Sequence, residues 1–354
     1  MAREGLTGFG TGQHTADPRP QSLRFPAAAP SATLAFISGA ALTRLVPMGE
    51  AIALVEQAMI DLSAGRVTAP ERWAVMVEGA RRLGIMPGAM GGLDCFGAKL
   101  ISLFGGAGRA SHQGLMLLFD LRTGAPMAVI DGATLTGLRT AAASAVATRA
   151  LANPDAARLA LLGCGEQARW HVRALRAERP IEEIHIWGRR RAAAEAFARG
   201  LGRDPDLRVV VHDDARDAVR EGDIVCTLTS ATDPVLEGAW LSAGQHVNLV
   251  GSSTRHSREI DDEGVARGYL IVDETAHALS QAGEFRHALE SRAVTPAHLV
   301  GEIGEVLSGR KPGRTDRRAI TLYKSLGHAA QDLVVAHAAL ERGRKVGDIA
   351  EFAW

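Results

Sequence analysis

The sequence of 354 residues is poor in cysteine and in aromatic residues and carries no net charge. Cys95, Cys164 and Cys226 are odd in number and form no C-x-x-C pair, which argues against a disulfide framework or a cysteine-based zinc site. The 12 histidines lack the H-E-x-x-H spacing of metal ligands, so we expect no metal. This cysteine usage predicts a cytoplasmic location.

The balance of 40 basic and 40 acidic residues leaves no basic footprint for nucleic acid or for an anionic membrane surface. No apolar run approaches the length of a membrane span. Residues 1–33 lack the apolar core of a secretory signal and are rich in Gly, Pro, Thr and Gln, so we expect them to form a flexible extension. Neither nucleic acid nor membrane is expected as a partner.

A glycine motif lies at the centre of the sequence. The apolar run Leu159–Leu162 predicts a buried strand, and Gly163, Gly165 and Ala168 follow it in the spacing G-x-G-x-x-A. A helix is expected next, over 166–177, and then a second strand at Ile184–Trp187. This strand–helix–strand context is typical of a dinucleotide site, in which the glycines permit a tight turn and a close approach of the pyrophosphate.

The residues after the second strand predict which dinucleotide is bound. An NAD site usually has an acidic residue there for the ribose 2′-OH, whereas arginine accommodates a 2′-phosphate. Here Gly188 is followed by Arg189, Arg190 and Arg191, and no acid occurs before Glu195. We therefore expect NADP(H) to be preferred, with NAD(H) as the alternative. A solvated basic helix start would also account for some of these arginines.

The length predicts two domains in an α/β protein. After the extension, residues 34–150 combine helices at Met48–Leu62 and 135–146 with successive strands, as in an α+β domain, and residues 151–302 alternate strands and helices, as in a doubly wound Rossmann domain. The expected strands are 73–77, 98–103, 113–119 and 126–130 in the first part, and 159–162, 184–187, 207–211, 224–228, 246–250 and 269–273 in the second. Residues 303–354 contain an apolar helical face from Leu322 to Leu340 and are expected to return to the first domain, which would then be discontinuous.

Three basic residues of the first domain lie in apolar or small-residue surroundings. They are Arg72, Lys99 within Gly-Ala-Lys-Leu-Ile, and Arg139 within an alanine-rich helix. A buried charge is costly unless it is paired. If the three converge, they form a site for a carboxylate, with a lysine able to donate a proton. Taken singly, each is better explained by a surface position or an ion pair, and the three are too far apart in the sequence for spacing to show convergence.

From about Leu42 to Leu340, the sequence resembles the ornithine cyclodeaminase/mu-crystallin family. The motifs that carry the resemblance are Pro70-x-Arg72, Lys99, Ser111-His112-Gln113-Gly114, Thr123-Gly124-x-Pro126, Asp131-Gly132-x-x-Leu135-Thr136-x-Leu138-Arg139-Thr140-Ala141-Ala142, Gly163-x-Gly165-x-Gln167-Ala168 and Gly244-x-His246-Val247-Asn248-x-Val250-Gly251. The resemblance implies a homodimer in which the sheet-rich domain, built from both ends of the chain, binds substrate and dimerises.

The resemblance also implies a role for individual residues. The substrate carboxylate would be held beside the nicotinamide by Arg72, Lys99 and Arg139. The substrate domain would contact the cofactor through Ser111, His112, Gln113, Arg139 and Thr140, and the nucleotide domain would bind the pyrophosphate through Gly163, Gly165, Glu166, Gln167 and Ala168. The adenosine ribose would lie against Gly188, Arg189 and Arg190, and the following strand ends would contribute Thr229, Ser230, Val250, Ser252 and Ser253.

Two departures from the cyclodeaminase pattern narrow the expected function. Ser253 stands where the cyclodeaminase has an aspartate, and Gly84-Ile85 precedes Met86-Pro87 where it has a glutamate. The carboxylate site, the lysine and the hydride donor remain, and they suffice for an NAD(P)H-dependent reductase of a small 2-imino or cyclic ketimine carboxylic acid. Such an enzyme would reduce, for example, Δ1-pyrroline-2-carboxylate to L-proline, or an open-chain imino acid to an L-amino acid. The alternatives are a nucleotide-dependent small-molecule binding protein, like mu-crystallin, and a true ornithine cyclodeaminase.

Overall fold

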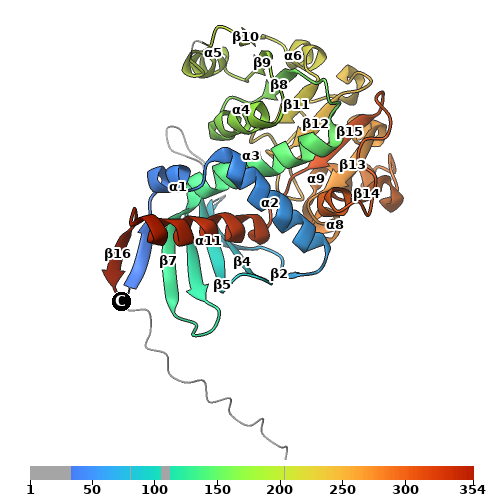
Figure 1. Ribbon diagram of the computed structural model, residues 1–354. Coiled ribbons are helices and arrows are strands. Elements are labelled where there is room, and N and C mark those ends of the chain that lie inside the picture. Colours follow the sequence, from blue (N-terminus) through green and yellow to red (C-terminus); the bar gives the residue numbers. More distant parts are fainter. Residues whose placement is uncertain (1–32, 80, 105–111, 203) are drawn as a thin grey trace, which may run out of the picture.

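The computed structural model describes residues 33–79, 81–104, 112–202 and 204–354, which fold around two sheets of eight strands each (Figure 1). All of the expected extension except Thr33 lies outside these residues, and so does Ser111. The expected fold class, an α/β protein with one doubly wound parallel sheet and a second, mixed sheet, is confirmed.

The first sheet has the order β16-β1-β7-β6-β5-β4-β2, with β3 paired to β4. Its pairs are antiparallel except β1 with β7, which is parallel. The strands are β1 (Thr33–Ile37), β2 (Val67–Thr68), β3 (Trp73–Glu78), β4 (Arg81–Met90), β5 (Cys95–Leu103), β6 (His112–Asp120), β7 (Pro126–Asp131) and β16 (Ala350–Ala353).

Four helices pack with this sheet, namely α1 (Gly39–Leu45), α2 (Met48–Ser63), α3 (Gly132–Leu151) and α11 (Ala329–Val346). Helix α11 contacts β4, β5 and β6, and it crosses the sheet in Figure 1. Side chains alternate between the two faces of a strand. In β5 the buried residues are Cys95, Gly97, Lys99 and Ile101, so the lysine shares its face with residues of the core.

The second sheet is entirely parallel, in the order β10-β9-β8-β11-β12-β15-β13-β14. Its strands are β8 (Arg158–Leu162), β9 (Glu183–Trp187), β10 (Arg208–Val211), β11 (Ile224–Thr227), β12 (His246–Leu249), β13 (Gly268–Val272), β14 (Leu299–Glu302) and β15 (Ile320–Lys324). The helices of this part are α4 (Glu166–Glu178), α5 (Arg191–Gly200), α6 (Ala215–Glu221), α7 (Asp262–Arg267), α8 (Thr275–Gln281), α9 (Gly283–Glu290) and α10 (Ile303–Leu307), with short 3-10 turns at Gly238–Trp240 and Pro296–His298.

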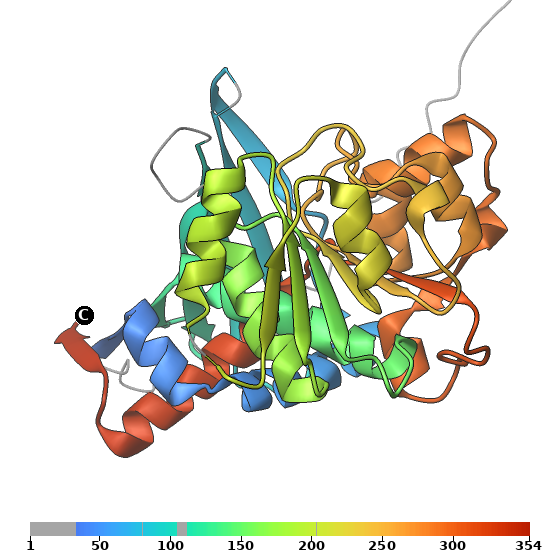
Figure 2. The same cartoon turned by 90° about the horizontal axis from the view of Figure 1, so that it is seen from above.

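Helix α3 joins the two parts. It contacts α2 and α11 on one side and α4, β12 and β15 on the other, and it lies between the two sheets in Figure 1. Every residue from Gly137 to Thr148 is buried, Arg139 included, and five of these residues are alanines, whose small side chains let the neighbouring elements pack closely. Seen from above, α1 and α11 lie together on one flank, and α8 and α9 lie on the opposite one (Figure 2).

The structure corrects the reading of residues 303–354. Leu322 was expected on a helical face that runs to Leu340, but it lies in strand β15, in the interior of the parallel sheet, and the helix begins only at Ala329. The chain therefore leaves the parallel sheet after Lys324, and only α11 and β16 join the first sheet. None of the helices in the described residues is long and apolar enough to cross a membrane.

Candidate functional site

Lys99 meets Asp332 of α11 inside the first domain. The lysine Nζ lies 2.8 Å from Asp332 Oδ1 and 2.7 Å from Oδ2, and both side chains are fully buried. Arg139 of α3 reaches the same carboxylate, with Nε 3.1 Å from Oδ1. One aspartate thus binds two of the three cations that the sequence analysis singled out.

Arg139 is fixed by two further contacts. Its guanidinium donates a hydrogen bond of 2.7 Å to Gln331 Oε1. A Cβ at Gly327 would lie 2.3 Å from the same guanidinium nitrogen, and Gly327 has a φ of +79°. Only glycine satisfies both conditions without strain. The close approach of the 326–328 backbone therefore depends on this residue.

Arg72 completes the group from the chain between β2 and β3. It donates a hydrogen bond of 2.9 Å to the carbonyl oxygen of Leu326, next to Gly327. Its Nε is buried and has no partner among the described residues. Burial and the charge of Arg139 lower the pKa of Arg72, while Asp273 and Asp332 oppose that effect. The three cations expected at one site therefore do lie together, and the Nε of Arg72 is left without a partner in the described part of the chain.

The pKa of Lys99 is lowered to about 7. Burial is the largest cause, and the charge of Arg139 adds to it, whereas Asp332 acts in the opposite direction. A lysine with this pKa exchanges a proton near neutral pH, as a general acid or base must. Perturbed groups of this kind are enriched at functional sites.

Asp332 is not among the residues expected from the sequence. A usable indication was present, because the helix reads His-Ala-Ala-Gln-Asp-Leu-Val-Val-Ala, with an amide and an acid between apolar residues. Gln331 and Asp332 are both fully buried. A buried carboxylate needs a partner, and the buried cations Lys99 and Arg139 were candidates.

The glycine loop has the form expected of a phosphate cradle. Gly163 ends β8 with a φ of +114°, and a Cβ there would lie 2.6 Å from the carbonyl oxygen of Leu228. Gly165 precedes α4 with open space beside its Cα and without a side-chain cap, and Ala168 is buried. The first N–H groups of α4 are therefore free to bind an anion. Gln167 adds a buried Oε1 without a partner in the described residues.

The arginines after β9 differ from one another. Arg191 is bound by Glu195, at 2.9 Å, and by Asp213. Arg189 and Arg190 are exposed and form no ion pair within the described part of the chain. Burial raises the pKa of the Cys164 thiol in the glycine loop, and the charge of nearby Arg190 opposes this effect. This places Arg190 close to the turn where the pyrophosphate is expected.

The remaining expected cofactor contacts lie around the same loop. Glu166, at the exposed N-terminus of α4, is close enough to Asp131 for the aspartate to raise its pKa, in addition to burial. Asp131 caps α3 and pairs with Leu115 of strand β6. The same strand begins with His112 and with Gln113, which is exposed. On α3, the Thr140 hydroxyl is buried without a partner among the described residues. At the carboxyl ends of β11 and β12 lie Thr229, exposed Ser230, buried Val250 and Ser252, and half-buried Ser253.

A group of Glu274, His277 and His328 has the composition of a metal site, with possible ligand atoms within 4.8 Å of one another. However, His328 Nδ1 accepts a hydrogen bond of 3.2 Å from the Ala330 N–H at the start of α11. The proton of the neutral imidazole is then on Nε2, the atom that faces Glu274 at 3.7 Å. A metal at Nε2 would require this helix cap to break. The expectation that the protein needs no metal stays a prediction.

The family model described as "Ornithine cyclodeaminase/mu-crystallin family" matches residues 35–346. The chain is 37% identical to the ketimine reductase mu-crystallin of Mus musculus over 289 residues, which cover 80% of this chain and 88% of the relative. The structure of Thermococcus litoralis Δ1-pyrroline-2-carboxylate reductase in complex with NADH and L-proline matches with a TM-score of 0.86 and 32% identity, over 89% of this chain and 98% of that one. An archaeal alanine dehydrogenase dimer with bound NAD matches with a TM-score of 0.85 and 28% identity, over 91% and 99% of the two chains.

Proposed function

This chain belongs to the ornithine cyclodeaminase/mu-crystallin family, and from that premise we propose that it is an NAD(P)H-dependent reductase of a small 2-imino or cyclic ketimine carboxylic acid. As a member of this group it is an NAD(P)-dependent oxidoreductase of the imine reductase type. The observation that carries the proposal is the buried cluster of Lys99, Arg139 and Asp332, with Arg72 beside it.

In the proposed mechanism the carboxylate of the imino acid binds to Arg72 and Arg139. The three buried cations face the carboxylate of Asp332 and, near Arg72, that of Asp273, so a carboxylate ligand offsets the positive charge that remains. Its negative charge also favours the protonated form of Lys99 and raises the pKa of this lysine above 7. Substrate binding thus protonates the group from which the imine nitrogen takes its proton.

Bound NAD(P)H supplies the hydride that reduces the imine carbon. The chain's own contribution is to fix the imine nitrogen at Lys99, with Asp332 orienting the ammonium group, and to hold the carboxylate at a fixed distance from it. Ser253 offers a hydroxyl and no carboxylate, so the base that the cyclodeaminase resemblance would require at this position is missing.

This function is tested by NAD(P)H oxidation against two panels: 2-oxo acids with ammonia or methylamine, and preformed cyclic ketimines. We expect turnover with at least one member, and the better panel distinguishes an open-chain from a cyclic substrate. Absence of turnover on every compound, together with carboxylate binding in the presence of NADPH, would identify a binding protein instead.

The pH dependence of the two reaction directions should be opposite. Reduction needs protonated Lys99, so kcat/KM for the imine should fall as the pH rises through about 7, the pKa of this lysine in the unliganded protein. Oxidation of the amino acid needs the neutral amine, and its kcat/KM should rise over the same range. Initial rates from pH 5.5 to 9 in both directions check this. Parallel profiles would mean that Lys99 does not transfer the proton.

We propose that NADP(H) is the preferred cofactor, because Arg189 and Arg190 are exposed beside the loop and no acid accompanies them. Replacing both by alanine should remove roughly 1.5–3 kcal/mol of preference, the value of hydrogen bonds to a charged group. The measurement is the ratio of kcat/KM for NADPH to that for NADH. Arg191→Ala is the matched control, since Arg191 is already engaged by Glu195. An unchanged ratio in the double variant would contradict the assignment.

We further propose that the protein is a homodimer. All six residues of β3 are exposed, and this strand pairs only with β4 among the described residues. Trp73, Val75, Met76 and Val77 expose 51–61% of their surface. Exposed apolar side chains gathered in this way mark an interaction surface. The archaeal alanine dehydrogenase relative supports the proposal, since it is a dimer.

A further inference from the structure

Glu259 binds two neighbouring strands of the parallel sheet at their carboxyl ends. It lies between β12 and α7, and none of its surface is exposed. Its Oε1 accepts hydrogen bonds of 2.7 Å from both the N–H and the hydroxyl of Thr229. Its Oε2 accepts from the Thr227 hydroxyl at 2.8 Å, from Gly251 N–H at 2.6 Å and from Ser252 N–H at 3.1 Å.

All of these neighbours act as donors, and three of them are backbone N–H groups that cannot accept. The proton of a protonated Glu259 could be accepted only by a threonine hydroxyl that would first have to turn around, so the hydrogen bonds favour the carboxylate. Burial raises the pKa of Glu259, and the charge of Lys324 and the hydrogen bonds from Thr229 and Thr227 oppose this effect. Lys324 lies nearby, bound to the carbonyl oxygen of Ser252 and, at 3.1 Å, to Glu284.

The two segments held by Glu259 are those expected to face the cofactor. Thr229 and Ser230 follow β11, while Val250, Ser252 and Ser253 follow β12. In an open parallel sheet the ligand binds outside the carboxyl ends of the strands. Oε1 holds the first segment and Oε2 holds the second, so the spacing between the two segments depends on one side chain. The proposed mechanism does not use Glu259.

We propose that Glu259 is a positioning residue for the cofactor, which sets the spacing of the β11 and β12 ends around the nicotinamide half of the site. This proposal rests on the proposed function. Glutamine at this position keeps the shape but turns one acceptor into a donor, which then faces Thr229 on one side or Gly251 and Ser252 on the other. One of the two segments must therefore move.

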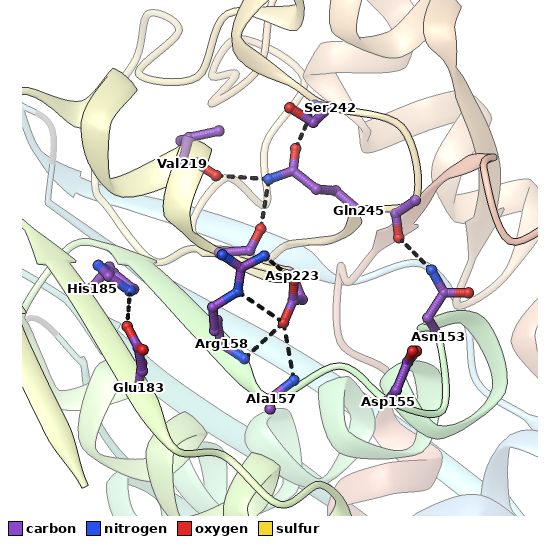
Figure 3. Close-up of polar contacts among 12 residues, drawn as sticks. Asn153, Asp155, Ala157, Arg158, Glu183, His185, Val219, Asp223, Ser242 and Gln245 are labelled. Atoms are coloured by element: carbon purple, nitrogen blue, oxygen red, sulfur yellow. Dashed lines mark hydrogen bonds and ion pairs between the residues drawn. The ribbon is translucent and has the colours of Figure 1, made fainter.

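A carboxylate at the amino ends of strands in the same parallel sheet provides a matched control. Asp223 accepts hydrogen bonds from Ala157 N–H and Arg158 N–H, both at 3.0 Å, and from the Arg158 guanidinium (Figure 3). It likewise joins two strands, β8 and β11, but at their amino ends. The four residues of β11 separate it from the Glu259 contacts by roughly 13 Å. Asp223→Asn therefore reports the cost of losing such a carboxylate away from the cofactor.

The experiment compares wild type, Glu259→Gln and Asp223→Asn in the full chain. The readouts are the NADPH dissociation constant from cofactor fluorescence, the KM for NADPH, the KM for the imine, and the melting temperature. For Glu259→Gln we expect the dissociation constant and the KM for NADPH to rise by about tenfold or more, the scale of a misplaced contact, with a smaller change in the KM for the imine. Asp223→Asn should lower the melting temperature only.

Equal cofactor binding in the two variants would overturn the proposal, because Glu259 would then be structural. If Glu259→Gln does not fold, Thr227→Val decides the matter, since it removes one of the hydroxyl donors and keeps the side-chain shape. It should weaken NADPH binding in the same direction by a few-fold, and unchanged binding would overturn the proposal. A wild type that binds NADPH but reduces no imine refutes the proposed function while the binding comparison still tests Glu259. A wild type that binds neither NADPH nor NADH refutes both.

Discussion

Replacing Lys99 by methionine is expected to reduce turnover by about a hundredfold or more, the scale of general acid catalysis. Lys99 is the only lysine before Lys311 in the sequence, and its ammonium group is enclosed with Asp332 in the core. Methionine fills most of the same volume, so we expect the fold and NADPH binding to persist. Steady-state kinetics on the best imine, with NADPH binding measured separately, give the result.

The control for this variant is Lys345→Met, which removes an exposed lysine at the end of α11 and should leave turnover unchanged. If Lys99→Met raises only the KM for the imine and keeps kcat, the lysine binds the carboxylate and the proton comes from elsewhere. If kcat falls and the pH dependence near 7 disappears from the remaining activity, Lys99 is the proton donor.

Asp332→Asn should have an effect of similar size by another route. Asparagine leaves Lys99 and Arg139 buried without a negative partner, and breaking a buried ion pair from one side costs about 3–5 kcal/mol. Because Asp332 raises the pKa of Lys99, its loss should also lower that pKa below 7. At neutral pH most of the lysine would then be neutral, and imine reduction would fail for lack of a proton.

Two measurements distinguish these effects. Urea unfolding gives the loss of stability, and Asp94→Asn serves as its control. Asp94 also pairs with a residue of α11, His337, but this pair lies on the surface, where ion pairs contribute less than about 1 kcal/mol. The pH profile of kcat/KM then reports on Lys99. We expect residual activity to increase as the pH is lowered below 7. A profile with the wild-type midpoint and a reduced amplitude would mean that Asp332 only stabilises the fold.

Much of this architecture could be predicted from local patterns. The glycine spacing after Leu162 and the apolar runs of the parallel strands are signals that short segments carry by themselves, and each expected strand of the parallel sheet is found within a residue or two. Strand β15 was missed because Leu322 and Leu326 have helical spacing with the residues that follow. The β-branched and aromatic residues Ile320, Thr321 and Tyr323 favoured a strand, and Gly327 separates it from the helix.

The site could be predicted only in part, for a different physical reason. Buried cations are conspicuous in a sequence because few positions in an apolar segment carry them. Their partners are harder to find, since Asp332 lies 233 residues from Lys99 and 193 from Arg139. Glu259 was missed for the same reason, because its importance lies in the donors that surround it in space, and the sequence around it is a run of charged and polar residues in which one glutamate does not stand out.

The position of β15 has a consequence for how the polypeptide acquires its structure. This strand is placed between β12 and β13, and the chain then passes directly into the helix that carries Asp332. During synthesis the parallel sheet therefore stays divided between β12 and β13 until the ribosome has released the residues after Ile320. Insertion of β15 between β12 and β13 and the pairing of Asp332 with Lys99 then follow closely on one another. The nucleotide-binding half is thus no transplantable unit, and recombination between relatives would have to exchange it together with the tail that completes it.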